Sequence, residues 1–377
     1  MKNEEDMKVL TVFGTRPEAI KMCPLVLELR KHSNIECLVC LTGQHREMLR
    51  QVMDSFEIVE DYNLDIMKDR QTLTTITTSV LEKLEPILIS IKPDVILVHG
   101  DTTTSYAAAL AAFYQKIPVG HVEAGLRTGD IYSPYPEEMN RLLTDRISTY
   151  YFAPTKRNYE NLINEGIKDN IFITGNTVID SFQYTVKSDY LFHEPILNEI
   201  EFNYNRVVIV TAHRRENQGE GIKNICSAIL RLAEEYKDVR FIYPVHLSPA
   251  VRDVVFPMLS NINNIILIDP VDVLDMHNMM SRCFMVMTDS GGIQEEAPHF
   301  GKPVLVLRTE TERPEAVEAG TVKVVGVDAD VIYNEAKLLF DNEAEYAKMA
   351  QSTNPYGDGH ASERIIRALL ETDRDRI

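Results

Sequence analysis

The sequence alternates short apolar runs with stretches of helical spacing along almost its whole length. Six apolar runs lie in the first half, Lys8–Gly14, Ile35–Gly43, Val95–Asp101, Pro118–Gly125, Tyr150–Thr155 and Ile171–Asn176. Six more lie in the second half, Val207–His213, Arg240–His246, Asn264–Pro270, Phe284–Ser290, Pro303–Arg308 and Thr321–Gly326. Because strands separated by helices form parallel sheets, this pattern predicts an α/β protein with two doubly wound, Rossmann-like domains of similar size.

The length of the chain agrees with two domains, since 377 residues exceed what one hydrophobic core usually supports. The polar, irregular stretch between Asp180 and Arg206 marks the boundary, so we expect domains at residues 1–180 and 181–359. Residues 360–377 follow a turn-rich stretch and contain the helical run Ala361–Leu370. We expect this last helix to pack back on the N-terminal domain.

Charge and hydropathy narrow the range of partners. The chain carries 39 basic and 57 acidic residues, a formal net charge of −18, which argues against nucleic acid or an anionic membrane as partner. No apolar run approaches the roughly 20 residues of a membrane span, and Met1–Asp6 is polar rather than signal-like. We therefore expect a cytoplasmic protein without membrane insertion.

Polar groups or glycines terminate many of the apolar runs. The clearest cases are Gly14-Thr15-Arg16, Gly43-Gln44-His45, His99-Gly100-Asp101, His121-Val122-Glu123, Thr211–Arg214, His246 and Asp289-Ser290. Ligands of open parallel sheets bind beyond the carboxyl ends of the strands. The pattern thus predicts that both domains direct their chemistry into one interdomain cleft.

The stretch Thr288–Glu296 has the features of an anion site at a strand-to-helix turn. Asp289 or Ser290 can cap the helix, and the two glycines that follow let backbone N–H groups approach an anion. Glu296 lies about one helical turn further on, where it can accept hydrogen bonds from a ribose diol. An ordinary capped helix is the alternative interpretation.

Cations and carboxylates follow other strands. Arg16 and Lys21 stand beside a helix start that contains Pro17, where they can bind an anion. Several carboxylates near strand ends suit proton abstraction and return, which need one group to take a proton and another to give it back. These are Asp101, Glu123, Glu137 and Glu138, with Arg127 and Arg141 nearby and His213 and Arg214 in the second half. Arg313, within Glu312–Glu315, can be another anion ligand. The alternatives are an N-cap for Asp101, a structural histidine for His213 and a helix-start salt bridge for Arg313.

Other familiar signatures are absent or explained more simply. There is no Gly-x-Gly-x-x-Gly after a strand, no Walker-type loop and no His-Glu-x-x-His, so nothing requires a redox cofactor or a metal. The five scattered cysteines are interpreted as buried free thiols. Tyr333 and Lys337 are interpreted as an i,i+4 helix pair, and Asp328 as a helix N-cap.

Taken together, the motifs resemble those of the non-hydrolysing UDP-N-acetylglucosamine 2-epimerases. The matching stretches are Phe13–Met22, Gly43–Leu49, Val98–Thr104, Gly120–Gly129, Gly175–Asp180, Tyr243–His246, Thr288–Pro298 and Asn354–Gly359. So many motifs in one order are highly specific. The resemblance implies a GT-B fold, two Rossmann-like domains with an interdomain active site, and a homodimer.

The family interconverts UDP-N-acetylglucosamine and UDP-N-acetylmannosamine without added metal or redox cofactor. The resemblance implies anti elimination of UDP to give 2-acetamidoglucal, followed by re-addition of UDP and protonation of carbon 2 on the opposite face. The product would supply surface polysaccharide synthesis. A proton-transfer pair, cations for the diphosphate and a closed cleft are what this chemistry needs.

The family's site residues carry over to matching positions of this chain. The catalytic group implied is Asp101, Glu123, Glu137 and His213, with the assignment of base and acid left open. The substrate ligands implied are Arg16, Lys21, Ser290, Gly291, Gly292, Glu296 and Arg313. Val271 and Met276 stand where relatives have a Gln and a Phe lining part of the uridine site, so main-chain groups and shape would replace those contacts.

Some bacterial members of the family bind a second UDP-N-acetylglucosamine as an activator. The residues that correspond to that second site are Gln44, Arg70, Arg214 and His246. Glu47 stands where some of those members have Gln, and a carboxylate there could repel the diphosphate. Activation by substrate is therefore a hypothesis for this chain.

Three other functions fit parts of the pattern. A hydrolysing relative would release UDP and free N-acetylmannosamine from the same site. A GT-B glycosyltransferase would pass the sugar to an acceptor, although the acidic cluster exceeds what simple transfer needs. A non-catalytic nucleotide-sugar sensor would not need that cluster at all.

Overall fold

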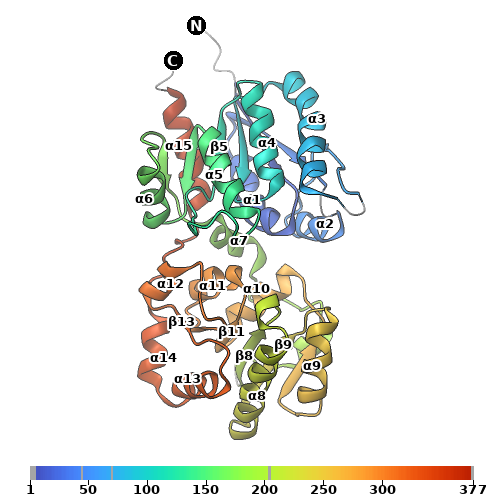
Figure 1. The fold of residues 1–377 in the computed structure, drawn as a ribbon, viewed down its shortest axis with the longest axis vertical. Coiled ribbons are helices and arrows are strands. Elements are labelled where there is room, and N and C mark those ends of the chain that lie inside the picture. Colours follow the sequence, from blue (N-terminus) through green and yellow to red (C-terminus); the bar gives the residue numbers. More distant parts are fainter. Residues whose placement is uncertain (1–5, 44–45, 69–70, 203–204, 375–377) are drawn as a thin grey trace. The chain divides into compact units, whose positions relative to one another are not determined.

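The computed structural model describes residues 6–43, 46–68, 71–202 and 205–374. The chain divides into two compact units, one formed by Met1–Tyr184 with Tyr356–Ile377 and the other by Thr185–Pro355. Each unit contains a parallel sheet whose successive strands are connected through helices (Figure 1). The predicted α/β class, with two Rossmann-like domains, is confirmed.

The first unit contains a seven-stranded parallel sheet in the order β3-β2-β1-β4-β5-β6-β7. Its strands are β1 Met7–Phe13, β2 Ile35–Leu41, β3 Tyr62–Asn63, β4 Val95–His99, β5 Val119–Val122, β6 Tyr150–Ala153 and β7 Ile171–Ile173. Its helices are α1 Arg16–Leu29, α2 Arg46–Ser55, α3 Leu73–Ile91, α4 Thr103–Tyr114, α5 Glu137–Ile147, α6 Lys156–Asn164, α7 Thr177–Thr185 and α15 Ala361–Arg374. β3 falls outside the predicted runs, because a two-residue strand that pairs only with the end of β2 leaves no apolar pattern in the sequence.

The second unit contains a six-stranded parallel sheet in the order β10-β9-β8-β11-β12-β13. Its strands are β8 Arg206–Thr211, β9 Val239–Pro244, β10 Ile265–Ile268, β11 Met285–Thr288, β12 Val304–Val306 and β13 Val322–Val324. Each overlaps a predicted run, and β8 and β9 begin one residue before theirs. Its α-helices are α8 Glu220–Glu235, α9 Pro249–Leu259, α10 Val273–Arg282, α11 Gly291–Glu296, α12 Pro314–Ala319, α13 Ala329–Asp341 and α14 Glu343–Ala350. Short 3-10 helices are η1 Pro195–Glu199, η2 Arg215–Asn217 and η3 Ala297–Phe300.

Both sheets reverse their strand order beside their first strand. β2 lies on one side of β1 and β4 on the other, and β9 and β11 flank β8 in the same way. Such a reversal opens a crevice at the carboxyl ends of the two central strands, which is where sheets of this kind bind ligands. The loops after β1 and β4, and those after β8 and β11, are therefore where each unit can build a site.

The central strands are buried, which explains their continuous apolar sequences. Every residue of β4 is buried, as are the last five residues of β1. α4 packs in the same core through a run of small buried residues, Ala107, Ala108, Ala109, Ala111 and Ala112. Short side chains let a helix approach a sheet closely, so the loop between β4 and α4 has a fixed position.

The last helix, α15, belongs to the first unit although it ends the chain, and it packs against α1 (Figure 1). Asp180 in α7 accepts hydrogen bonds from Ala361 N (3.1 Å) and Ser362 N (2.7 Å). This side chain caps α15 from another helix, a contact that in ordinary N-caps stabilises by about 1 kcal/mol. The cap fixes where the returning segment docks.

The structure also tests the predictions made for Asp328, for Tyr333 and Lys337, and for the cysteines. Asp328 caps α13 by accepting from two backbone N–H groups at 3.0 Å, as predicted. Tyr333 and Lys337 share one surface partner, the Glu235 carboxylate. All five cysteines are free, four of them buried and Cys37 half-buried. No helix in the described part of the chain is both long and apolar enough to cross a membrane.

Candidate active site

One buried carboxylate ties together the two helix starts at the reversal of the first sheet. Glu18 accepts hydrogen bonds from Gly14 N (2.9 Å) and Thr15 N (2.7 Å) at the start of α1. Its other oxygen accepts from the hydroxyls of Thr102 (2.6 Å) and Ser105 (2.7 Å) at the start of α4. The loops that carry the predicted site residues are thus fixed to one another.

The two predicted cations of this unit have different environments. Arg16 is the first residue of α1 and is exposed, with Pro17 beside it in the first turn as predicted. Lys21 is half-buried further along the helix, and its ammonium group pairs with the carboxylate of Glu123. The structure therefore joins Lys21 to a predicted catalytic residue.

Glu123 is held from several sides at the end of β5. Besides Lys21, Asn176 donates a hydrogen bond from Nδ2 to Glu123 Oε1 (3.2 Å), and His99 Nε2 lies 3.9 Å from the same oxygen. The backbone of Glu123 has φ +70°, a left-handed conformation that is uncommon for a residue other than glycine. A non-glycine residue kept in such a conformation suggests a functional constraint on its side chain.

Asp101 forms an ion pair with an arginine and does not cap a helix. Thr102 caps α4, while Asp101 Oδ2 accepts from Arg141 Nε (3.0 Å) and Nη2 (2.6 Å). Arg141 also donates from Nη1 to Glu138 Oε2 (2.9 Å). Glu137, the first residue of α5, is half-buried and lies on the helical face of Arg141 because the two are four residues apart. Asp101 and Glu138 are thus joined through the Arg141 guanidinium.

The corresponding loop of the second unit is organised by Asp289, which is fully buried. Its Oδ2 accepts hydrogen bonds from His213 N (2.8 Å), Arg214 N (2.8 Å) and Asn217 Nδ2 (3.0 Å), and its Oδ1 lies 3.4 Å from His213 Nδ1. The prediction that Asp289 or Ser290 caps α11 through its side chain is wrong. Asp289 turns towards the loop after β8, and Ser290 occupies the N-cap position without a side-chain cap bond.

Two guanidinium groups flank the start of α11. A methyl group placed on Gly291 would lie 3.7 Å from Arg313 Nη2 and 3.8 Å from Arg214 Nη2. Arg313 also pairs through Nε with Glu295, which fixes its direction. Cations beside the N–H groups of Gly291 and Gly292 form an arrangement suited to a diphosphate.

Glu296 ends α11 close to the predicted uridine residues. A methyl group on Gly292 would lie 3.2 Å from Glu296 Oε1, and His277 Nε2 of α10 lies 3.7 Å from Glu296 Oε2. Burial lowers the pKa of His277 to about 3, so this ring is neutral. Met276 is half-buried on the same helix, and Val271 is half-buried just before it.

His213 and His246 are stacked, with ring centroids 5.3 Å apart and planes 9° from parallel. Ser248 N donates to His246 Nδ1 (3.1 Å), so the proton of a neutral His246 sits on Nε2. The predicted second-site residues therefore adjoin predicted substrate residues, His246 beside His213 and Arg214 beside Gly291 and Arg313. Gln44 and Arg70 lie outside the described residues, and so does the side chain of Glu47.

Several residues of these clusters, among them Arg141, Asn176 and Asp289, were not predicted as catalytic or substrate residues. Arg141 and Asp289 stand beside predicted site residues in the sequence, and Asn176 lies in the matching stretch Gly175–Asp180. Their roles depend on which side chain each one faces across the sheet. Sequence spacing carries no signal for such contacts between distant segments.

Among the described residues, His193, Asp272 and Asp275 lie close enough together to hold a metal ion. Asp275 already accepts from Tyr190 Oη (2.8 Å), His193 N (2.9 Å) and Glu194 N (3.0 Å). Asp272 Oδ2 lies 2.5 Å from His193 Nδ1. The group is explained as the anchor of residues 190–194 on α10, and it contains no predicted site residue.

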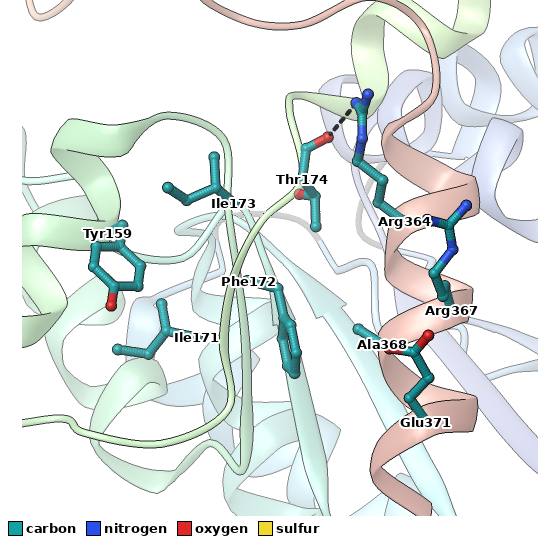
Figure 2. Close-up of a pocket in the computed structure, with 9 residues that line it drawn as sticks. All are labelled: Tyr159, Ile171, Phe172, Ile173, Thr174, Arg364, Arg367, Ala368 and Glu371. Carbon is teal, nitrogen blue, oxygen red and sulfur yellow. Dashed lines mark hydrogen bonds between the residues drawn. The ribbon is translucent and has the colours of Figure 1, made fainter.

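A hollow of about 410 Å³ between β7 and α15 is also separate from these clusters (Figure 2). Ile171, Phe172 and Ala368 line it, and Arg364 donates from Nη1 to Thr174 O (3.1 Å) at its edge. Arg364 is also paired with a carboxylate, Asp358, at 2.7 Å. None of the predicted catalytic or substrate residues lies in this hollow.

Known proteins resemble the chain over nearly its whole length. A family model described as UDP-N-acetylglucosamine 2-epimerase matches residues 27–370. The UDP-N-acetylglucosamine 2-epimerase of Escherichia coli K12 is 54% identical over 370 residues, spanning 96% of this chain and 98% of that protein. The Bacillus subtilis 168 enzyme of the same name is 53% identical over 365 residues, spanning 97% of this chain and 95% of that protein. A crystal structure of the Neisseria meningitidis UDP-GlcNAc 2-epimerase bound to UDP-GlcNAc is 52% identical, covers 97% of this chain and 100% of its own, and has a TM-score of 0.87.

Proposed function

The chain belongs to the UDP-N-acetylglucosamine 2-epimerase family of enzymes, and we propose that it interconverts UDP-N-acetylglucosamine and UDP-N-acetylmannosamine by eliminating and re-adding UDP. The observation that carries this reaction is the group of carboxylates in the first unit, in which Lys21 holds Glu123 and Arg141 holds Asp101. Epimerisation at carbon 2 needs carboxyl groups that take and return a proton at fixed positions.

The proposed first step breaks two bonds. One of the carboxylates removes the proton from carbon 2, and the electron pair of that C–H bond forms a double bond to carbon 1. The C–O bond at carbon 1 breaks, and the diphosphate leaves with its electron pair. In the second step UDP adds back to carbon 1, and carbon 2 takes a proton on its opposite face. Atoms and electrons balance with UDP and one proton, so no redox partner is required.

We propose that the second unit holds UDP throughout. The N–H groups of Gly291 and Gly292, the Ser290 side chain and the Arg313 guanidinium would bind the diphosphate, and Glu296 would bind the ribose. The cations beside α11 support this role, because they compensate charge that develops on the leaving diphosphate. Holding UDP also keeps its return an intramolecular step.

The remaining roles are proposals from the family pattern. Arg16 and Lys21 would bind the substrate from the first unit, Val271 and Met276 would line the uridine site, and Glu137 and His213 would complete the proton-transfer group. The enzyme would act as a cytoplasmic homodimer and supply UDP-N-acetylmannosamine for surface polysaccharides. Light scattering on the purified chain tests the dimer.

A second substrate molecule is proposed as an activator, bound near Arg214 and His246. The stacking of His246 on His213 supports this idea, because a ligand at His246 would contact the neighbour of a proposed catalytic residue. The initial rate with UDP-N-acetylmannosamine should then rise when a trace of the other epimer is added. A hyperbolic curve that the trace does not change would remove the proposal.

One experiment separates the proposed function from its competitors. The enzyme is incubated with UDP-N-acetylglucosamine in deuterated water, and the products are followed by NMR. The proposed reaction places deuterium at carbon 2 of an intact UDP-sugar in both epimers. Accumulation of free UDP and free sugar would indicate a hydrolysing enzyme instead. An unchanged substrate would point to a transferase or a sensor.

A further inference from the structure

His121 is a fully buried histidine whose two ring nitrogens both face hydrogen-bond acceptors. It lies in β5, two residues before Glu123. Its Nδ1 is 2.5 Å from Asp145 Oδ1 of α5, and its Nε2 is 2.7 Å from the main-chain oxygen of Gly100 in the loop after β4. The ring therefore joins three elements of the first unit.

The partners determine how the ring is protonated. A carbonyl oxygen can only accept, so Nε2 carries a hydrogen. Asp145 also accepts hydrogen bonds from Arg127 Nη2 (2.6 Å) and Gly125 N (3.2 Å). These donors stabilise the ionised form of its carboxylate. Burial by itself would raise the pKa of Asp145, but His121 and Arg127 together lower it. Nδ1 therefore also carries a hydrogen, and the ring is an imidazolium.

The charged groups around the His121 ring balance one another. Arg127 pairs with Glu165 (2.6 Å) as well as with Asp145, so two cations and two carboxylates balance. On the neighbouring strands, burial lowers the pKa of His99 to about 3 and raises the pKa of Tyr151 to about 12. His99 and Tyr151 are thus neutral near pH 7, and Glu123 has Lys21 as its cation.

The imidazolium holds a turn that carries a proposed catalytic residue. Gly100 has φ +65° and donates from its N–H to Val122 O (2.9 Å), while its carbonyl accepts from His121. The next residue is Asp101. A methyl group on Gly100 would lie 3.2 Å from Glu123 Oε2, so the turn packs directly on the other carboxylate. His121 thus sets the main chain of Asp101, and Arg141 sets its side chain.

We propose that His121 is a positioning residue, an imidazolium whose two N–H groups fix the Gly100–Asp101 turn so that Asp101 and Glu123 keep the separation that proton transfer requires. This inference rests on the proposed function, because it takes these two carboxylates as the proton-transferring groups. It assigns to His121 no contact with the substrate.

Two substitutions of His121 each keep one of the ring's two hydrogen bonds and remove the other. The amide nitrogen of glutamine reaches the position of Nε2 and that of asparagine the position of Nδ1. His121→Asn should therefore lose the bond to Gly100 and lower kcat by roughly 10- to 100-fold, the usual effect of a small misplacement of reacting groups. His121→Gln should recover most of that loss. KM and the Kd for UDP should change less than about twofold in both variants, because the proposed UDP residues lie in the second unit.

If a variant fails to fold, a second measurement on the wild-type enzyme tests the same inference. NMR of side-chain ¹⁵N-labelled histidine at pH 7 should show a hydrogen on both ring nitrogens of His121. The exposed His360 provides the control position, since His360→Gln should keep wild-type kinetics. A neutral ring at His121 would overturn the inference, as would equal rates for the wild type and His121→Asn. A wild-type enzyme that exchanges no deuterium at carbon 2 would instead overturn the proposed function.

Discussion

The two carboxylates at the ends of β4 and β5 are each held by one cation from a different helix. Lys21 of α1 pairs with Glu123, and Arg141 of α5 pairs with Asp101 through two nitrogens. Both Arg141 nitrogens donate to the same oxygen, Asp101 Oδ2, and so fix its direction as well as its distance, whereas an ammonium group fixes little more than distance. Arg141 should therefore be the more demanding of the two contacts.

Arg141→Lys tests this difference because it keeps the charge and removes the two-pronged geometry. We expect kcat to fall roughly 10- to 100-fold, since Asp101 would lose its defined orientation. Deuterium incorporation at carbon 2 measures the rate. Arg146→Lys, an exposed position on the same helix, is the matched control and should be unaffected. Equal activity of both variants would show that charge alone holds Asp101.

Two buried histidines should make the free energy of unfolding depend on pH. Burial lowers the pKa of both His99 and His277 to about 3, whereas an unfolded histidine titrates near 6.5. Between these values the unfolded chain binds a proton that the folded chain does not, so the free energy of unfolding falls as the pH is lowered. Each histidine should contribute about 1.4 kcal/mol per pH unit within this window.

His277→Gln isolates one of these contributions. Urea unfolding of the second unit at pH 7 and pH 5 should show the wild type losing about 2 kcal/mol more than the variant across that interval. His99→Gln should leave the second unit's pH dependence as it is, because His99 lies in the first unit. An unaltered pH dependence in His277→Gln would mean that the folded ring is already protonated.

The helix starts at the sheet reversals are fixed in different ways in the two units. In the first unit Thr15 and Glu18 form a capping box at the N-terminus of α1. The Glu18 carboxylate also accepts hydrogen bonds from two hydroxyl groups at the start of α4. In the second unit Asp289 holds the loop after β8 and no side chain caps α11. The first arrangement satisfies donors at both helix starts through one carboxylate, and the second leaves the start of α11 without a side-chain cap.

Glu18→Gln should destabilise the first unit strongly. An amide offers one acceptor oxygen in place of two, so hydrogen-bond donors at the start of α1 or α4 lose their partner at a cost of about 1–3 kcal/mol each. We expect a total loss of roughly 3 kcal/mol or more in the free energy of unfolding, measured with denaturant. Glu28→Gln, in the surface pair of α1 with Lys31, should cost less than about 1 kcal/mol. Equal effects at both positions would contradict the role given to Glu18.

The elements that could be predicted from sequence are those whose signal is local. Periodicity gave twelve strands of the two sheets, and Pro17 and Asp328 marked helix starts, because these features depend on neighbours in the chain. The cap at Asp289 was predicted wrongly because its carboxylate prefers three donors across the sheet. The short strand β3 and the partners Arg141 and Asn176 depend on pairing between distant segments, which spacing does not reveal.

The chain as a whole divides its groups between two sheets in a way that matches the two halves of the proposed reaction. Carboxylates held by cations lie in the first unit, and guanidinium groups around a helix start lie in the second. The net charge of −18 makes these local cations important, because the chain as a whole does not attract an anionic substrate. Binding and proton transfer should therefore be separable by mutation.

A pair of variants, one in each unit, tests this separation. Gly291→Ala places a methyl group between the Arg214 and Arg313 guanidinium groups at ordinary contact distance, so the unit should fold but the diphosphate should be obstructed. We expect the Kd for UDP to rise roughly tenfold or more, as for a lost charge-assisted contact. Gly221→Ala, also in ordinary contact, is the control within the same unit.

Glu123→Gln is the counterpart in the first unit. It keeps the size of the side chain and removes the basic carboxylate, so kcat should fall by at least about 100-fold while the Kd for UDP stays within about twofold. Calorimetry with UDP and deuterium exchange at carbon 2 give the two quantities for each variant. Loss of UDP affinity in Glu123→Gln, or full affinity with lost turnover in Gly291→Ala, would show that the two units do not divide the reaction as proposed.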